Sequence, residues 1–327
     1  MCTSLTMQTL TGNNFLGRTM DFAFELEGKP VFIPKNYLWK NQLGEKFKTK
    51  YGFVGTGRKL TEFILADGIN EKGLAIAELY FSNEAKYFQQ SKKNYINFAP
   101  HELIFWILGE IATIEELEVK IKKVNLVALP VELLNIVVPL HFIITDRTGK
   151  TVVLETNNNR IELKENPIGV LTNSPEFEWH LKNLNNYIGI NPQPVQKKKI
   201  EELNLHPFGQ GSGTFGLPGG NTSPERFIRT VYNRAYCEKN DKSSQTLNTV
   251  FQLLNIVSIP RGVSEQEDGL IHHTQYFSTF DLESLNYYYS PSSTQEIFEL
   301  SLPSLLSQNS AALEFCVNSR LKTTILH

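Results

Sequence analysis

Cys2 directly follows the initiator methionine, and only three cysteines occur in the 327 residues of the chain. A cysteine at this place can do chemistry once Met1 is removed, because its thiol then shares a residue with a free α-amine. The ordinary pKa of an α-amine is about 7.7 to 8.0, so the amine is substantially neutral near pH 7. One residue would then supply both a nucleophile and a general base. The alternative is a small, partly buried apolar residue that opens a strand.

Two charged residues in the stretch GRTMDF are suited to act on this thiol and amine. If the stretch is a strand that pairs with the N-terminal one, we expect Arg18 to stabilise the thiolate and Asp21 to orient the amine. The spacing alone leaves open an ordinary surface ion pair between Arg18 and Asp21.

In the first third of the chain, the segments that must position these residues have patterns typical of β-strands. Residues 3–10, 14–22 and 30–37 carry β-branched and aromatic side chains in short runs, and residues 62–81 form two apolar runs around the turn NEKG. Over residues 99–127 the apolar spacing becomes helical and predicts two consecutive helices. Thr113 and Glu116 fit a capping box for the second of them.

The rest of the chain repeats this change of pattern. Residues 140–156 predict a hairpin, and Thr222 or Ser223 is suited to cap a helix with Pro224 in its first turn. A further helix over 245–259 precedes strands between 274 and 302. This order of strands, helices, strands, helices and strands favours an α+β fold with antiparallel sheets, in a single domain over residues 2–327.

Several other patterns carry no function in this interpretation. The run GSGTFG matches a dinucleotide motif but is followed by LPGG where a helix should open, and a shaped loop is favoured instead. His272 and His273 are adjacent, which is poor geometry for joint metal ligation. The run QKKKIEE around Lys197 is interpreted as a solvated helix face.

Composition excludes several classes of function. A net charge of -2 gives no global attraction to nucleic acid or to anionic membranes. No signal peptide and no apolar run long enough for a membrane span is visible, so we expect a cytoplasmic protein. The three cysteines lack CxxC spacing, which argues against disulfides and against a cysteine zinc site.

A set of motifs in one order connects these observations. They are MCTS, LGRTMDF, FIPKNY, ADGINEKGLAIAELYF, GVLTNSPEFEWH, GQGSGTFGLPGG, SPERFIR and HHTQYFS, and they span roughly residues 1 to 280. Together they resemble the choloylglycine hydrolase family, which includes bile salt hydrolases and penicillin V acylases. The resemblance implies an N-terminal nucleophile hydrolase, with two stacked antiparallel sheets between helical layers. It also implies an amidase that acts on a small-molecule N-acyl amide after Met1 is removed, without a metal or organic cofactor, as a homotetramer.

The resemblance also assigns roles to individual residues. Cys2 matches the nucleophile and base, and Arg18 and Asp21 match the residues around its thiol and amine. Asn173, in LTNSP, matches the asparagine of the oxyanion hole, and Arg226, in SPERF, matches a further active-site arginine. An amide donor near the carbonyl oxygen suits the negative charge that develops there during thiolate attack.

One departure from the family pattern bears on the substrate. The family's bile salt hydrolases carry a sequence similar to GLNF where this chain has ELYF. The resemblance thus places Tyr80 at the oxyanion site, where bile salt hydrolases have an asparagine and penicillin V acylases a tyrosine. This favours phenoxyacetyl-type or other hydrophobic acyl groups, with conjugated bile salts as the alternative; Tyr80 packing only as a strand aromatic stays open. Phe22, Phe24 and Phe63 are candidates for the acyl pocket, or else ordinary core residues.

Two further interpretations remain at this point. One is a noncatalytic protein that binds acyl ligands without turnover. The other is a thiol peptidase that pairs Cys2 with a histidine such as His101, His141 or His180, although no motif links them.

Overall fold

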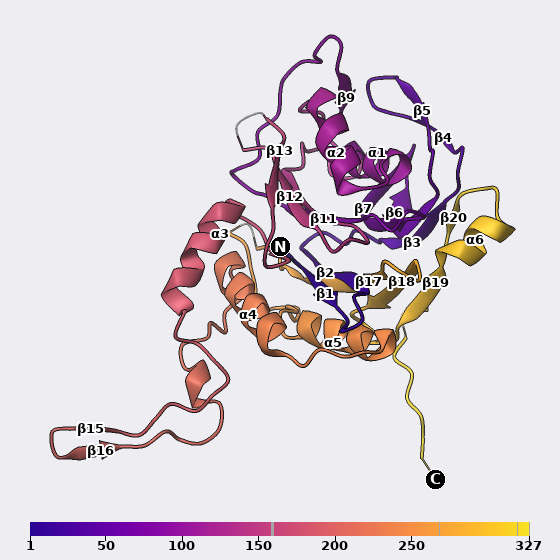
Figure 1. Cartoon of the computed structure of the whole chain (residues 1–327). Helices are drawn as coiled ribbons and strands as arrows, with labels where there is room; N and C mark the ends of the chain where they lie inside the picture. Colours follow the sequence, from indigo (N-terminus) through magenta and orange to yellow (C-terminus); the bar gives the residue numbers. More distant parts are fainter. Residues whose placement is uncertain (158–159, 268, 319, 327) are drawn as a thin grey trace.

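The structure, a computed structural model, describes residues 1–157, 160–267, 269–318 and 320–326. Two large antiparallel sheets are stacked between two layers of helices (Figure 1). The six-stranded sheet contains, in spatial order, β14 (Val170–Leu171), β1 (Cys2–Gln8), β2 (Asn14–Phe22), β17 (His273–Asp281), β18 (Asn286–Pro291) and β19 (Phe298–Ser301). The eight-stranded sheet contains β13 (Glu162–Glu165), β12 (Thr151–Glu155), β11 (Leu140–Thr145), β8 (Ala75–Tyr80), β7 (Phe63–Asn70), β6 (Phe53–Lys59), β3 (Lys29–Ile33) and β20 (Leu313–Glu314).

Helices cover the outer face of each sheet. Figure 1 shows α1 (Leu103–Glu110) and α2 (Ile114–Lys120) over the eight-stranded sheet, and α4 (Ser223–Tyr236) and α5 (Ser243–Asn255) over the six-stranded one. The other helices are α3 (Phe177–Asn183), α6 (Leu302–Gln308) and the 3-10 helices η1 (Pro100–Glu102), η2 (Ile121–Lys123), η3 (Leu184–Tyr187) and η4 (Ser212–Thr214). Three small strand pairs are β4 (Leu38–Lys40) with β5 (Lys46–Lys48), β9 (Ile96–Phe98) with β10 (Val124–Leu126), and β15 (Lys198–Ile200) with β16 (Leu203–Leu205). The predicted α+β class, with antiparallel sheets between helical layers, is confirmed.

The core explains why the N-terminal strand is buried. One hydrophobic cluster, which includes Leu5 and Phe227, joins the facing sides of the two sheets to α4 and α5. A second cluster, which includes Phe53 and Trp106, lies between the eight-stranded sheet and α1. Since β1 is covered on both faces, all of its residues from Cys2 to Met7 are buried, the polar ones included. The thiol of the second residue therefore lies inside the protein.

The predicted helix caps form, one of them only in part. Thr222 caps α4 in a capping box with Glu225, as the sequence predicts. At α2, the Glu116 N–H donates to Thr113 Oγ1 at 3.2 Å. The Glu116 carboxylate, however, accepts its hydrogen bond from the backbone of Ala112 rather than from that of Thr113.

The prediction of a helix around Lys197 is wrong. Residues 198–200 instead form β15, which pairs with β16 in a hairpin that turns at Glu201 with a left-handed φ of 52°. Figure 1 shows this hairpin projecting away from the two sheets. Its strand residues are exposed, the apolar Ile200, Leu203 and Leu205 included.

Candidate active site

The first two strands bring a thiol and a guanidinium together. In their register Cys2 lies opposite Met20 and Ser4 lies opposite Arg18, so Cys2 and Arg18 are diagonal neighbours. Arg18 Nη2 donates to Cys2 Sγ at 3.1 Å, and Met20 Sδ lies 3.9 Å from the same sulfur. A charged donor at this distance stabilises negative charge on the sulfur.

Arg18 is also held by groups from both sheets. Its Nη1 donates to Asp67 Oδ2 at 3.2 Å and to Tyr276 Oη at 3.2 Å, and the Tyr276 hydroxyl donates to Asp67 Oδ2 at 2.9 Å. Burial lowers the pKa of Arg18, but Tyr276, Cys2 and Asp67 together raise it by more, so the guanidinium stays charged. The sequence interpretation missed both Asp67 and Tyr276, although Asp67 lies within the run ADGIN.

Asp21 lies on the other side of the same strand. It follows Arg18 by three residues, so the two side chains point to opposite faces. A surface ion pair between them is excluded, because both are fully buried and each has other partners. The Asp21 carboxylate accepts hydrogen bonds from Thr19 Oγ1 at 2.9 Å and Thr274 Oγ1 at 2.5 Å. Its backbone N–H donates to the Met1 carbonyl at 3.0 Å, and the Met1 ammonium donates to the Asp21 carbonyl at 2.5 Å.

Asn173 and Arg226 converge on the backbone of Cys2. The Cys2 N–H donates to Asn173 Oδ1 at 2.7 Å, and Asn173 Nδ2 donates to the Tyr80 carbonyl at 2.7 Å. Arg226 Nη2 donates to Asn173 Oδ1 at 2.7 Å, while its Nη1 donates to the Cys2 carbonyl at 2.5 Å and to Thr3 Oγ1 at 2.5 Å. Burial lowers the pKa of Arg226. The structure thus brings residues from β1, β8, the β14–α3 connection and α4 to one point.

The segment that carries Asn173 is fixed by side chains that the sequence interpretation did not assign to this role. His141 Nε2 contacts the Thr172 carbonyl at 2.8 Å, and His180 Nε2 contacts the Asn173 carbonyl at 2.9 Å. Since carbonyl oxygens only accept, both Nε2 atoms carry a proton. The Asn173 N–H donates to Ser223 Oγ at 2.9 Å. These contacts hold the peptide on both sides of the Asn173 side chain.

Two of the histidines named for a thiol peptidase, His141 and His180, have other partners. His141 also contacts Glu155 at 3.3 Å, and burial lowers the pKa of His101 and of His180 to about 4. Within the described ranges, no hydrogen bond joins a histidine to the Cys2 thiol. The pairing of Cys2 with a histidine base therefore has no support from the geometry.

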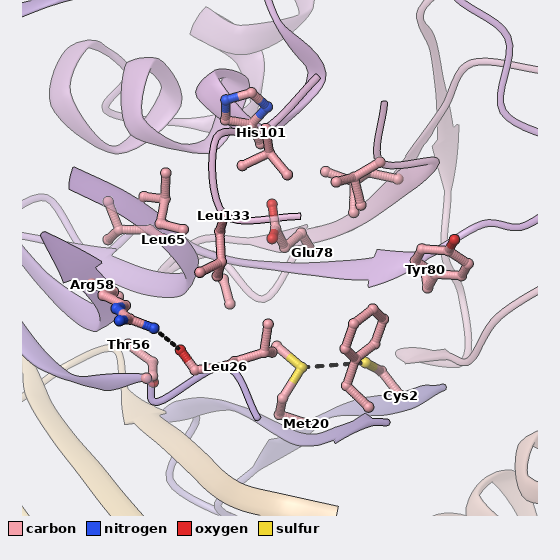
Figure 2. Close-up of a pocket in the computed structure, with 18 of the residues that line it drawn as sticks. Cys2, Met20, Leu26, Thr56, Arg58, Leu65, Glu78, Tyr80, His101 and Leu133 are labelled. Atoms are coloured by element: carbon pink, nitrogen blue, oxygen red, sulfur yellow. Dashed lines mark hydrogen bonds between the residues drawn. The ribbon is translucent and has the colours of Figure 1, made fainter. Parts of the chain in front are cut away.

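An apolar cavity lies against Cys2 (Figure 2). Its walls include Phe22, Leu65, Leu133 and Leu140. Tyr80 also lines it, with its ring edge-on to Phe22 at a centroid distance of 5.8 Å. A mainly apolar cavity beside a nucleophile is suited to an acyl group.

Two of the three predicted pocket phenylalanines lie elsewhere, and only Phe22 is in the cavity wall. Phe24 is 44% exposed because β2 ends at Phe22 and the chain leaves the sheet. Phe63 faces the helix-covered side of its sheet, where its ring packs against Tyr37 at 6.1 Å. The predictions for Phe24 and Phe63 are corrected accordingly.

The described residues offer neither a cluster of metal ligands nor a membrane-spanning helix. No three or more histidine, cysteine, aspartate or glutamate side chains are grouped so as to hold a metal ion. In the same residues, no helix has both the length and the apolar character needed to cross a membrane.

These features define a class of protein. Two antiparallel sheets between helical layers, with a cysteine thiol at the start of a central strand, are the architecture of an N-terminal nucleophile hydrolase. The family model of linear amide C–N hydrolases, choloylglycine hydrolase family, matches residues 2–310. The chain belongs to this choloylglycine hydrolase family and is an amide hydrolase.

Within the family, the chain is more similar to some members than to others. The bile salt hydrolase/transferase of Clostridium perfringens is 36% identical over 299 residues, which are 91% of each chain. A crystal structure of a mutant of the conjugated bile acid hydrolase from Clostridium perfringens superposes with a TM-score of 0.93, at 30% identity over the whole of both chains. The penicillin V acylase of Pectobacterium atrosepticum is more distant, at 26% identity over 87% of this chain and 76% of its own. The similarity is thus higher to the bile salt hydrolases, the alternative in the substrate prediction, than to the favoured penicillin V acylases.

Proposed function

We propose that this amide hydrolase cleaves conjugated bile salts, using Cys2 as the nucleophile. The observation that carries the proposal is the convergence of Arg18, Asn173 and Arg226 on the thiol and backbone of Cys2 at the edge of an apolar cavity. Higher similarity to bile salt hydrolases than to a penicillin V acylase supports the substrate class. The tyrosine at position 80 favoured the prediction of a penicillin V acylase. Its contact with Asn173, however, is made by the Tyr80 backbone carbonyl and does not depend on the tyrosine side chain.

The first step of the proposed mechanism is removal of Met1, which turns the Cys2 nitrogen into an amine. Asn173 Oδ1 already accepts from this nitrogen, and the loss of Met1 frees the Asp21 N–H and carbonyl that contact it. The amine takes the proton of the thiol, and the thiolate beside Arg18 attacks the amide carbonyl.

The second step is collapse of the tetrahedral intermediate. The Asn173 amide has a second N–H besides the one that donates to Tyr80, and it is suited to stabilise the oxyanion. The Cys2 ammonium gives its proton to the leaving nitrogen, the C–N bond breaks, and an acyl thioester remains on Sγ. Water then attacks the thioester with the amine as base, which releases the carboxylic acid and restores the thiol.

The test compares turnover of glycine- and taurine-conjugated bile salts with that of penicillin V by the same preparation. We expect a higher kcat/KM for release of glycine or taurine than for hydrolysis of penicillin V. In Cys2→Ala the kcat/KM should fall by at least about a thousandfold, because the nucleophile is absent. A higher kcat/KM for penicillin V would overturn the substrate assignment. Undiminished hydrolysis by Cys2→Ala would overturn the nucleophile.

Product release in the same assay, together with a binding measurement, distinguishes this function from the noncatalytic alternative. A protein that binds acyl ligands without turnover would show saturable binding of a conjugated bile salt and no product over hours. The presence of the thiol, the amide donor and both arginines around one point favours turnover.

We also propose that the chain assembles as a homotetramer. The projecting β15–β16 hairpin supports self-association, because it exposes Ile200, Leu203 and Leu205 far from the core of its own chain.

A further inference from the structure

The cavity beside Cys2 opens where two neighbouring strands part. β7 and β8 are paired only between Asp67–Ile69 and Ala75–Ala77. Beyond these residues the two strands form separate walls of the cavity, lined by Ile64, Leu65 and Ala66 on one strand and by Glu78, Leu79 and Tyr80 on the other. Figure 2 shows Glu78 among the side chains that line this space.

Glu78 is a carboxyl group in a mainly apolar wall. Its Oε2 is shielded from solvent and has no hydrogen-bond partner in the part of the chain that the structure describes. Among the described residues, Arg18 forms no ion pair with this carboxyl; it donates instead to the Glu78 backbone carbonyl at 3.2 Å, and also to Asp67, Tyr276 and the thiol. The Glu78 carboxyl takes no part in the proposed mechanism.

The carboxyl is protonated at neutral pH. Burial raises the pKa of Glu78 to about 8, with Arg18 opposing the rise and Asp67 adding to it. A neutral carboxyl offers one O–H donor and one carbonyl acceptor. Within an apolar cavity such a group favours a ligand that completes its hydrogen bonds, since an unpaired polar group there is unfavourable.

We propose that Glu78 forms a hydrogen-bonding subsite within the acyl cavity and selects acyl groups that carry a hydroxyl or carbonyl oxygen several bonds from the scissile amide. This inference rests on the proposed function, since it places the acyl group of the substrate in this cavity. Glu78 lies two positions before Tyr80 on β8, and the Tyr80 carbonyl marks the position of Asn173. The separation along β8 is therefore about 6.6 Å.

The charge around the cavity favours a neutral oxygen over a charged substituent. Arg58 lines the cavity and Arg18 contacts the backbone of its wall at Glu78, and these two positive charges disfavour an ammonium group on the acyl chain. A carboxylate on the acyl chain would have to lose its water in an apolar space.

The test uses N-acylglycines of one chain length, either unsubstituted or with a single hydroxyl at successive carbons. We expect wild-type kcat/KM to be at least about tenfold higher for one hydroxylated isomer than for the plain chain. Glu78→Gln, which keeps a donor and an acceptor, should retain most of this preference. Glu78→Leu and Glu78→Gly, which both remove the carboxyl group, should abolish it. Equal kcat/KM for all isomers in the wild type, or an unchanged preference in Glu78→Leu, would overturn the proposal.

A binding measurement separates this proposal from the proposed function. Calorimetry of the same ligands with Cys2→Ala should show tighter binding of the selected isomer, and Glu78→Leu in that background should remove the difference. If conjugated bile salts are not hydrolysed, the proposed function fails, but the binding comparison still shows whether Glu78 selects the hydroxylated ligand. Equal binding of hydroxylated and plain chains to Cys2→Ala would refute the subsite even in an active enzyme.

Discussion

At the scale of single residues, the partners of Arg18 decide what the thiol can do. The residue types around Cys2 were predictable, because the thiol chemistry and the motif order both point to Arg18 and Asp21. The Asp67 partner was not, since it lies 49 residues away on the other sheet and no local pattern reports a contact between sheets. The buried pair of Arg18 and Asp67 replaces the surface pair that spacing alone left open.

Arg18 should contribute separately to stability and to catalysis. Arg18→Leu leaves the Asp67 carboxylate buried and unpaired, so we expect a loss of about 3–5 kcal/mol in the free energy of unfolding. It should also lower kcat/KM about a hundredfold, because the thiolate loses its charged donor. In the double variant Arg18→Leu, Asp67→Leu, urea denaturation should show recovered stability while the assay shows no recovered activity. Recovery of both would mean that Arg18 is only structural.

Glu78 should make the protein less stable as pH rises. Its folded-state pKa of about 8 lies above its ordinary value of 4.5. Below about pH 4.5 the group is protonated in both states; between these values only the unfolded chain ionises, which favours unfolding progressively. Glu78→Gln does not titrate at this position, so its stability relative to wild type should rise between pH 5 and pH 8, by at most a few kcal/mol.

The measurement for Glu78 is urea denaturation of both proteins at several pH values. All other titrating groups, Arg18 and Asp67 included, are common to the two proteins and largely cancel in the difference. A stability difference that stays constant from pH 5 to pH 8 would show that the folded carboxyl ionises at its ordinary pKa.

At the scale of elements, the connection from β14 to α3 positions the oxyanion donor. The motif LTNSP identified Asn173, but the supports of its backbone come from β11, α3 and α4. Short-range patterns place strands and capped helices well, as at Thr222, and they miss contacts made between elements. The hairpin at residues 198–205 was misjudged because a charged run resembles a solvated helix face.

His180 is a positioning residue for Asn173. His180→Ala removes the donor to the Asn173 carbonyl, so we expect kcat to fall about tenfold while KM changes little, because a small displacement of the oxyanion donor weakens only transition-state binding. The matched control is His206→Ala, at an exposed position. An unchanged kcat, or a change confined to KM, would rule out the positioning role.

At the scale of the whole molecule, the sheet sandwich and the projecting hairpin serve different purposes. The two sheets bury β1 and place Cys2 beside the cavity, whereas the hairpin lies away from both. The order of strands and helices predicted an α+β fold with antiparallel sheets, and the family resemblance implied their stacking between helical layers. Neither reports which side of the molecule meets another copy.

Replacing Ile200, Leu203 and Leu205 with serine should lower the oligomeric mass of the protein. The apolar contacts of the hairpin would be lost, so light scattering should show a tetramer for the wild type and smaller species for the variant. Val119→Ser, at an exposed apolar position on α2, is the control and should leave the mass unchanged. A monomeric wild type, or a tetrameric triple variant, would contradict the assignment of the hairpin.

The central claim is that an acyl group is transferred to the thiol of an N-terminal Cys2. The most direct measurement is mass spectrometry of the N-terminal peptide after turnover of a conjugated bile salt is quenched with acid. We predict a peptide that begins at Cys2, lacks Met1 and carries the bile acyl group as a thioester on Sγ. An active enzyme whose N-terminal peptide retains Met1, or whose acyl group is attached to another residue, would contradict the mechanism.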